Sequence, residues 1–215
     1  MISDRSETPT GEFPAHAALR AMVEVEAQNV RLADDLAASF QAFLDALTAI
    51  TREATGNEAV SLLLLQVSQV SLAGARLGAQ RDITPLGEFQ PDVGPDADFD
   101  DVRMQLGELL GNADVYSHVL DPYQPELVVS SLADDLTAIA ADLENGMRHH
   151  RAGDVDEAMW WWQFSYVSNW GSLASAVQKA LHSVVSHDRL DVDNASEQDQ
   201  IDAAEAVLDA TSPEA

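Results

Sequence analysis

Carboxylate and imidazole side chains stand four residues apart at two places in the chain, a spacing at which they could share a metal ion. The pairs are Glu12 with His16 and Asp114 with His118. Residues four apart lie on one face of a helix, where such a pair either binds a metal or forms an ordinary surface hydrogen bond. Because the surface hydrogen bond is the commoner outcome, we predict no metal site and no cofactor.

A run of aspartates imitates the start of a calcium-binding loop. Asp96, Asp98 and Asp100 match its first three ligand positions, but Asp101 replaces the required glycine and Gly107 replaces the final glutamate. The sequence also has no phosphate-binding glycine loop, no nucleophile elbow and no Glu-x-x-His pair of the kind that holds metal ions in a helical bundle. We therefore assign no catalytic residue.

The most unusual segment is aromatic. The residues from Trp160 to Trp170 (WWWQFSYVSNW) include all four tryptophans and no charge. At about 100° per residue, two apolar faces cover more than half of a helix here. Such a helix belongs in the middle of a bundle, where aromatic clusters usually form the core. The first face is Trp160, Phe164, Val167, Gly171 and Ala174, and the second is Trp162, Tyr166, Trp170, Leu173, Val177, Leu181 and Val184.

Two residues of this helix are candidates for binding. Trp161 falls on the remaining strip of serines, so it is either an exposed anchor for a partner or covered by the proline-rich loop or the acidic tail. His182 lies between the first apolar face and the serine strip. A half-buried, hydrogen-bonded histidine is the commoner outcome at such a position, with ligand binding as the alternative.

Apolar residues recur every three or four positions through most of the chain, and no segment alternates as a strand would. The expected fold is an all-α, antiparallel bundle of five to six helices, with a long loop rich in proline and glycine at 81–99. The first expected helix runs from Pro14 to Gly56, and the second runs from an N-cap at Asn57 to Ala79. The third runs from Asp100 to Leu120 with an interruption at Gly111 and Asn112, and a turn follows at Asp121–Pro125.

Three more helices are expected in the second half of the chain. The fourth runs from Leu132 to a stop at Gly153, and the fifth runs from an N-cap at Asp154, with Glu157 in the capping-box position, to about His187. The sixth runs from Glu197 to Leu208.

These elements divide the chain into three parts. We expect a disordered N-terminus at 1–13, a helical bundle domain at 14–188, and an acidic tail with a short amphipathic helix at 189–215. The N-terminus lacks the apolar stretch of a secretory signal, which indicates a cytoplasmic protein. The uncharged stretch from Ala59 to Ala75 is interrupted by Gln66, Ser68 and Gln69, so we expect a buried bundle helix there and no membrane span.

The net charge of the chain limits the kinds of partner that it can bind. It has 37 acidic residues against 11 basic ones, a formal net charge of −26, and no cysteine. This field opposes direct contact with nucleic acid or anionic membranes, and it suits a basic protein partner. The alternative is that the charge only keeps the protein soluble. The absence of cysteine removes disulfides and thiol catalysis, and the oligomeric state does not follow from these residues.

Three segments carry a family resemblance: LGELLGNADVYSHVLDPY, SLADDLTAIAADL and WWWQFSYVSNWGSLASAVQKALH. Across Leu32 to Val185 the chain resembles the bacterial domain-of-unknown-function family 5063. The resemblance implies a helical bundle and brings no established activity. Its actinobacterial members often lie near a recombination mediator gene, which implies an accessory role in DNA repair by association alone.

The resemblance also points to residues. The aromatic helix of that family often reads F-x-x-H-W-G-x-H with a later A-L-H, so Trp170, Gly171 and His182 match it. Asn169 and Leu173 stand where histidines are common, which argues against a histidine-dependent role in this chain. The candidate partner- or ligand-binding residues are thus Trp161, Trp170, Gly171 and His182.

The sequence therefore favours a non-catalytic protein-interaction module, for which the acidic surface and the position of Trp161 are the reasons. The alternative is a small-ligand-binding domain or an unrecognised enzyme, with its pocket between the aromatic helix and the loop from Arg81 to Phe99.

Overall fold

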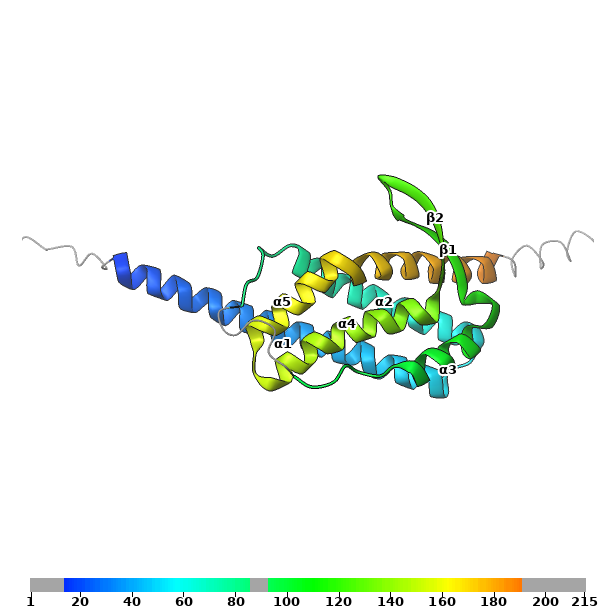
Figure 1. The fold of residues 1–215 in the computed structure, drawn as a ribbon, viewed down its shortest axis with the longest axis horizontal. Helices are drawn as coiled ribbons and strands as arrows, with labels where there is room; N and C mark the ends of the chain where they lie inside the picture. The colour runs from blue at the N-terminus through cyan, green and yellow to red at the C-terminus, as the bar shows by residue number, and fades with distance from the viewer. Residues whose placement is uncertain (1–13, 86–92, 191–215) are drawn as a thin grey trace, which may run out of the picture.

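The computed structural model describes residues 14–85 and 93–190 (Figure 1). The predicted N-terminal segment, most of the acidic tail and its short helix lie outside the described residues. The elements are α1 (Pro14–Glu53), α2 (Gly56–Gly78), α3 (Asp100–Leu110), β1 (Val115–Asp121), β2 (Gln124–Ser131), α4 (Leu132–Ala152) and α5 (Val155–Ser165). α5 continues through a π-helical turn, Tyr166–Trp170, into a further helical stretch at 171–190, called the C-terminal helix below.

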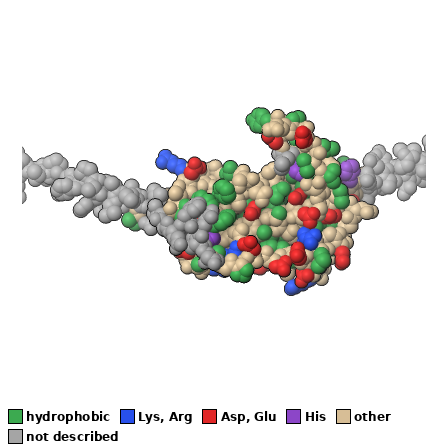
Figure 2. All heavy atoms as spheres, viewed as in Figure 1, with side chains coloured by type: hydrophobic (Ala, Val, Ile, Leu, Met, Phe, Trp, Pro, Cys, Tyr) green, Lys and Arg blue, Asp and Glu red, His purple; other side chains and the backbone are tan. Residues whose placement is uncertain are grey.

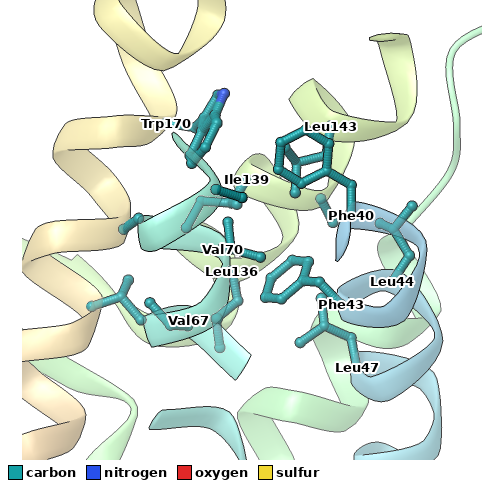
Figure 3. Close-up of a cluster of buried hydrophobic side chains, with 14 of the residues drawn as sticks. Phe40, Phe43, Leu44, Leu47, Val67, Val70, Leu136, Ile139, Leu143 and Trp170 are labelled. Atoms are coloured by element: carbon teal, nitrogen blue, oxygen red, sulfur yellow. The ribbon is translucent and has the colours of Figure 1, made fainter. Parts of the chain in front are cut away.

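The helices lie side by side as a bundle, and the all-α class is confirmed (Figure 1). α1 contacts α2 and α4, and α4 also contacts α3 and α5. The apolar stripe predicted for α1 faces the core: Leu36, Phe40, Phe43 and Leu47 are fully buried or nearly so. Figure 3 shows three of them, Phe40, Phe43 and Leu47, in the same cluster as the side chains of α4 and the ring of Trp170.

The helix ends follow local chemistry in part. α4 begins with the Ser131 hydroxyl accepting from the backbone N–H of Asp134 (3.1 Å), and it ends at Gly153, whose φ of 89° favours glycine. Asp154 precedes α5 as predicted, but its side chain accepts no capping hydrogen bond. Thr55 is the residue before α2, in place of the predicted Asn57.

α2 contains the one stretch of the described chain that is long and apolar enough to cross a membrane, Glu58–Gly78. In this structure it is a bundle helix, as predicted. Ala59, Leu63, Val67 and Val70 are buried in the core, and α2 contacts α1, α3 and α5.

Residues 115–131 form a β hairpin, which corrects the prediction of a helix for residues 115–120. β1 pairs antiparallel with β2, and the predicted turn between them is correct. The Asp121 carboxylate accepts from the backbone N–H of Tyr123 (2.8 Å) and fixes that turn. Apolar residues occur on both faces of the strands, so the period of two was hidden. The hairpin projects away from the bundle (Figure 1).

Candidate functional site

The predicted binding residues do not form one site. Trp170 is fully buried, and its ring meets Phe40 edge-on with centroids 6.0 Å apart. Gly171 has a spatial reason to be glycine, because a Cβ there would lie 2.5 Å from the backbone oxygen of Tyr166. His182 is exposed, not half-buried as predicted, and its ring faces the Ser186 hydroxyl at 3.5 Å.

Trp161 is half-buried at the junction of α4 and α5. Its ring stacks on His149, with centroids 6.1 Å apart, and meets Trp160 edge-on at 5.1 Å. Burial lowers the pKa of His149, so the neutral imidazole is favoured there. The indole Nε1 of Trp161, Nδ1 of His149 and Nε of Arg148 are buried without a hydrogen-bond partner in the described part of the chain. Trp161 is therefore partly covered, and its anchor role stays a prediction.

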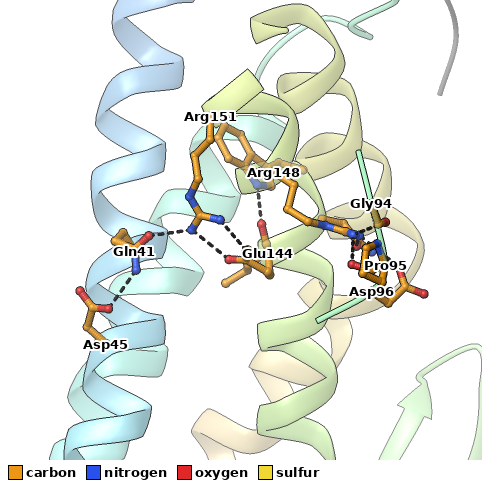
Figure 4. Close-up of polar contacts among 11 residues, drawn as sticks. Gln41, Asp45, Gly94, Pro95, Asp96, Glu144, Arg148 and Arg151 are labelled. Carbon is orange, nitrogen blue, oxygen red and sulfur yellow. Dashed lines mark hydrogen bonds and ion pairs between the residues drawn. The ribbon is translucent and has the colours of Figure 1, made fainter. Parts of the chain in front are cut away.

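Arg148 holds the end of the proline-rich loop against α4 (Figure 4). Its guanidinium donates to the backbone oxygens of Gly94 (2.7 Å) and Pro95, to the Asp96 carboxylate (3.1 Å) and to the side-chain oxygen of Asn145. The guanidinium is mostly buried, which gives these charge-assisted bonds more weight than a surface pair. This contact is structural and offers no ligand position.

Two of the aspartates that imitate a calcium-binding loop in sequence accept hydrogen bonds from the protein itself. Asp98 accepts from the backbone N–H of Asp100 (2.9 Å), and Asp96 accepts from Arg148. Within residues 14–85 and 93–190, no group of three or more histidine, aspartate or glutamate side chains comes together as metal ligands would.

One apolar face of the aromatic helix is exposed over part of its length, which corrects the prediction for Phe164. Phe164 is 53% exposed and Val167 is 75% exposed, and the Phe164 ring stacks on Trp160 with centroids 5.2 Å apart. Trp162 on the other face is fully buried, and its Nε1 donates to the backbone oxygen of Leu143 (2.9 Å). The first apolar face is thus exposed at Phe164 and Val167 and fully buried only at Ala174, whereas Trp162, Trp170, Val177 and Leu181 of the second face are all buried.

The hairpin carries an apolar face that the sequence analysis missed. Side chains of one strand alternate between two faces, and residues opposite each other in an antiparallel pair share a face. The register pairs Val119 with Leu127 and Ser117 with Val129. The exposed fractions are 64% for Val115, 45% for Val119, 71% for Leu127 and 68% for Val129. These four residues are called the outer face below, and Figure 2 shows the hairpin standing clear of the bundle.

The base of the hairpin is fixed to α4. The Tyr116 hydroxyl donates to the Asp135 carboxylate (2.7 Å), and burial raises the pKa of both groups. Asp114 accepts twice from the first turn of α4: its backbone oxygen from the N–H of Leu132 and its carboxylate from the N–H of Ala133, both at 2.8 Å. Because these bonds lock the first strand residues onto a rigid helix, the hairpin has a defined orientation.

Asp114 and His118 do not form the surface pair predicted for a helix. Asp114 caps α4, whereas Nε2 of His118 lies 3.2 Å from the Ser130 hydroxyl across the hairpin. The His118 ring stacks on Tyr116 with centroids 5.2 Å apart. Tyr116, His118 and Val128 form the inner face of the hairpin, on the side opposite to the outer face.

A pocket of about 450 Å³ lies between the hairpin and the C-terminal helix. This is not the predicted location beside the loop from Arg81 to Phe99. Its apolar wall includes Ala176, Ala180 and Val184. Its polar lining includes Asn112, Tyr116, His118, Lys179, Ser183 and His187. The spacing of Lys179, Ser183 and His187 at four residues was the sequence signal that could have revealed this face.

Comparison with known proteins identifies the family of this chain. The profile of a domain of unknown function, DUF5063, matches residues 27–187. The chain therefore belongs to the DUF5063 family, and the sequence resemblance is confirmed. No curated protein matches the chain.

A solved structure shares the fold. It is the crystal structure of protein BF1032 from Bacteroides fragilis, with a TM-score of 0.55 and 19% identity over 73% of this chain and 91% of that one. At this identity the likeness concerns the fold alone.

Proposed function

We propose that this protein is a non-catalytic interaction module that binds a protein partner through the outer face of its hairpin. The observation that carries the proposal is the exposure of Val115, Val119, Leu127 and Val129 on one side of a two-stranded sheet. An isolated two-stranded hairpin is marginally stable in water, and exposed apolar groups gathered on one face are typical of binding surfaces. A partner covering this face would remove four apolar side chains from water.

The charge of the chain indicates the chemistry of that partner. At a formal net charge of −26, long-range attraction favours a protein whose apolar contact residues are ringed by lysine and arginine. A second copy of this chain would carry the same charge and be repelled. An accessory role in DNA repair would have to act through such a partner, because the acidic chain opposes direct contact with DNA.

The outer face can be tested without disturbing the bundle. We would change Leu127 and Val129 to threonine, a residue that suits strands, so that the hairpin keeps its backbone preference. The matched control changes Leu72 and Met104 to glutamine, because these residues are 68% and 55% exposed on α2 and α3. Both variants convert two exposed apolar side chains to polar ones.

The partner would first be identified with a photo-crosslinking amino acid placed at Val129, and its affinity for purified wild-type protein and both variants would then be measured by calorimetry. We expect the Leu127→Thr, Val129→Thr variant to bind at least about tenfold more weakly, equivalent to about 1.4 kcal/mol. The control should bind like the wild type. Equal affinity of all three proteins, or crosslinking only to a second copy of the chain, would refute the proposal.

A further inference from the structure

We propose that the pocket between the hairpin and the C-terminal helix binds a small organic anion, with a phosphate or carboxylate attached to an apolar or aromatic body. This inference can be tested separately from the proposed function, because Leu127 and Val129 of the outer face do not line the pocket, although Val115 does. A pocket volume of about 450 Å³ is typical of sites that bind small molecules.

A basic side chain lines this pocket in a chain that has few basic residues. Lys179 is the single lysine of the sequence, and it lines the pocket together with His118 and His187. Four of the arginines are engaged with carboxylates in ion pairs: Arg76, Arg103, Arg148 and Arg151. By contrast, the Lys179 ammonium has no hydrogen bond or ion pair with any residue of the described ranges.

The walls of the pocket suit the rest of such a ligand. The stacked rings of Tyr116 and His118 form an aromatic side, and Ala180 and Val184 form an apolar side on the C-terminal helix. The Ser183 hydroxyl lies on the same wall but already donates to the backbone oxygen of Lys179 (2.9 Å), so Lys179 is the donor to the anionic group. The hydroxyl of Tyr116 is already committed to Asp135 and contributes its ring only.

The carboxylate in the pocket and the net charge of the chain both limit the size and charge of the ligand. Asp188 is the one carboxylate among the lining residues, so a ligand with a single anionic group can be placed near Lys179 and away from it. A polyanion such as nucleic acid would extend beyond the pocket and meet the field of a chain with a net charge of −26. The geometry therefore selects a small molecule with one charged end.

The single lysine makes the test direct. Protein labelled with ¹³C at the lysine ε-carbon gives one NMR signal from this side chain, and it reports on the pocket alone. We would titrate the full chain with phenyl phosphate, with inorganic phosphate, and with benzyl alcohol as the neutral analogue. We expect a saturable shift of the lysine signal that is strongest for phenyl phosphate, because this probe has both the charge and the ring.

Affinity for phenyl phosphate would be compared between the wild type, Lys179→Gln and Arg189→Gln by calorimetry, because Lys179→Gln removes the lysine signal. Arg189 is an exposed cation of the same helix that does not line the pocket, so its change alters the net charge equally. Loss of one charge-assisted hydrogen bond predicts binding about tenfold weaker for Lys179→Gln and unchanged for Arg189→Gln. No saturable shift, or equal weakening by both substitutions, overturns the inference. The Leu127→Thr, Val129→Thr variant should bind the probe normally, so this result is separable from the proposed function.

Discussion

Gly146 on α4 offers the sharpest test of the core. The indole of Trp162 crosses α4 at this position, and its Nε1 donates to the backbone oxygen of Leu143 (2.9 Å). A Cβ on Gly146 would lie 2.6 Å from Cε2 of Trp162 and closer still to its Nε1 and Cδ1. The indole is rigid and fully buried, so it cannot turn aside without losing that hydrogen bond.

The magnitude of the Gly146→Ala effect follows from opposing contributions. Alanine gains about 1 kcal/mol over glycine inside a helix. Overfilling a core costs about 1–3 kcal/mol, and a buried N–H left without its acceptor costs about another 1–3 kcal/mol. The net result is a loss of roughly 1–5 kcal/mol, and the midpoint of about 3 kcal/mol lowers the melting temperature by roughly 6–12 °C in a chain of this size.

Gly107 supplies the matched control. It lies inside α3, and a Cβ there would meet no atom within 4 Å. Gly107→Ala should therefore keep the propensity gain and raise the melting temperature by roughly 2–4 °C. Thermal unfolding followed by circular dichroism and by tryptophan fluorescence measures both variants. If Gly146→Ala melts at or above the wild type, Trp162 does not occupy the space described here.

Two further changes test the surroundings of the aromatic helix. Burial raises the pKa of Asp142 above its ordinary value of 3.8, so the ionised carboxylate weakens the fold at neutral pH. Asp142→Asn can keep the contact with Asn169 (2.7 Å) and should melt a few degrees higher than the wild type at pH 7. This gain should vanish as the pH falls through the raised pKa towards 3.8, which melting curves across this pH range would measure. Trp161→Ala removes a half-buried ring stacked on His149, so the loss of stability should stay below the roughly 3–5 kcal/mol typical of a core tryptophan. If Trp161 is an anchor, the variant should also bind the partner more weakly. A loss of stability as large as that of a core tryptophan would contradict the anchor role.

The helices could be predicted because their signals are local. The stripe of Leu36, Phe40 and Phe43 needs only the helical period, and Gly153 needs only the freedom of glycine at positive φ. Both features depend on residues within a few positions of each other. The family resemblance rested on the same segments and is confirmed.

Neither the exposure of Phe164 nor the existence of the hairpin could be predicted from such local signals. An apolar face on a helix becomes core only if another element covers it, and that depends on where the neighbouring helices lie. The period of two in β1 was hidden because Val115 and Val119 lie on one face while Tyr116 lies on the other. The Tyr116–Asp135 bond that holds the strand to α4 spans 19 positions and has no local signal.

The two proposed sites share one element but can fail separately. Leu127 and Val129 point to the outer face of the hairpin and do not line the pocket, whereas Lys179 lines the pocket from the C-terminal helix. Because successive side chains of a strand face opposite ways, a threonine at Val129 leaves the inner face unchanged. The anchoring of Tyr116 and Asp114 on α4 holds both faces in fixed positions. Loss of partner binding in one variant and of probe binding in the other would therefore assign two functions to the two sides of a single hairpin.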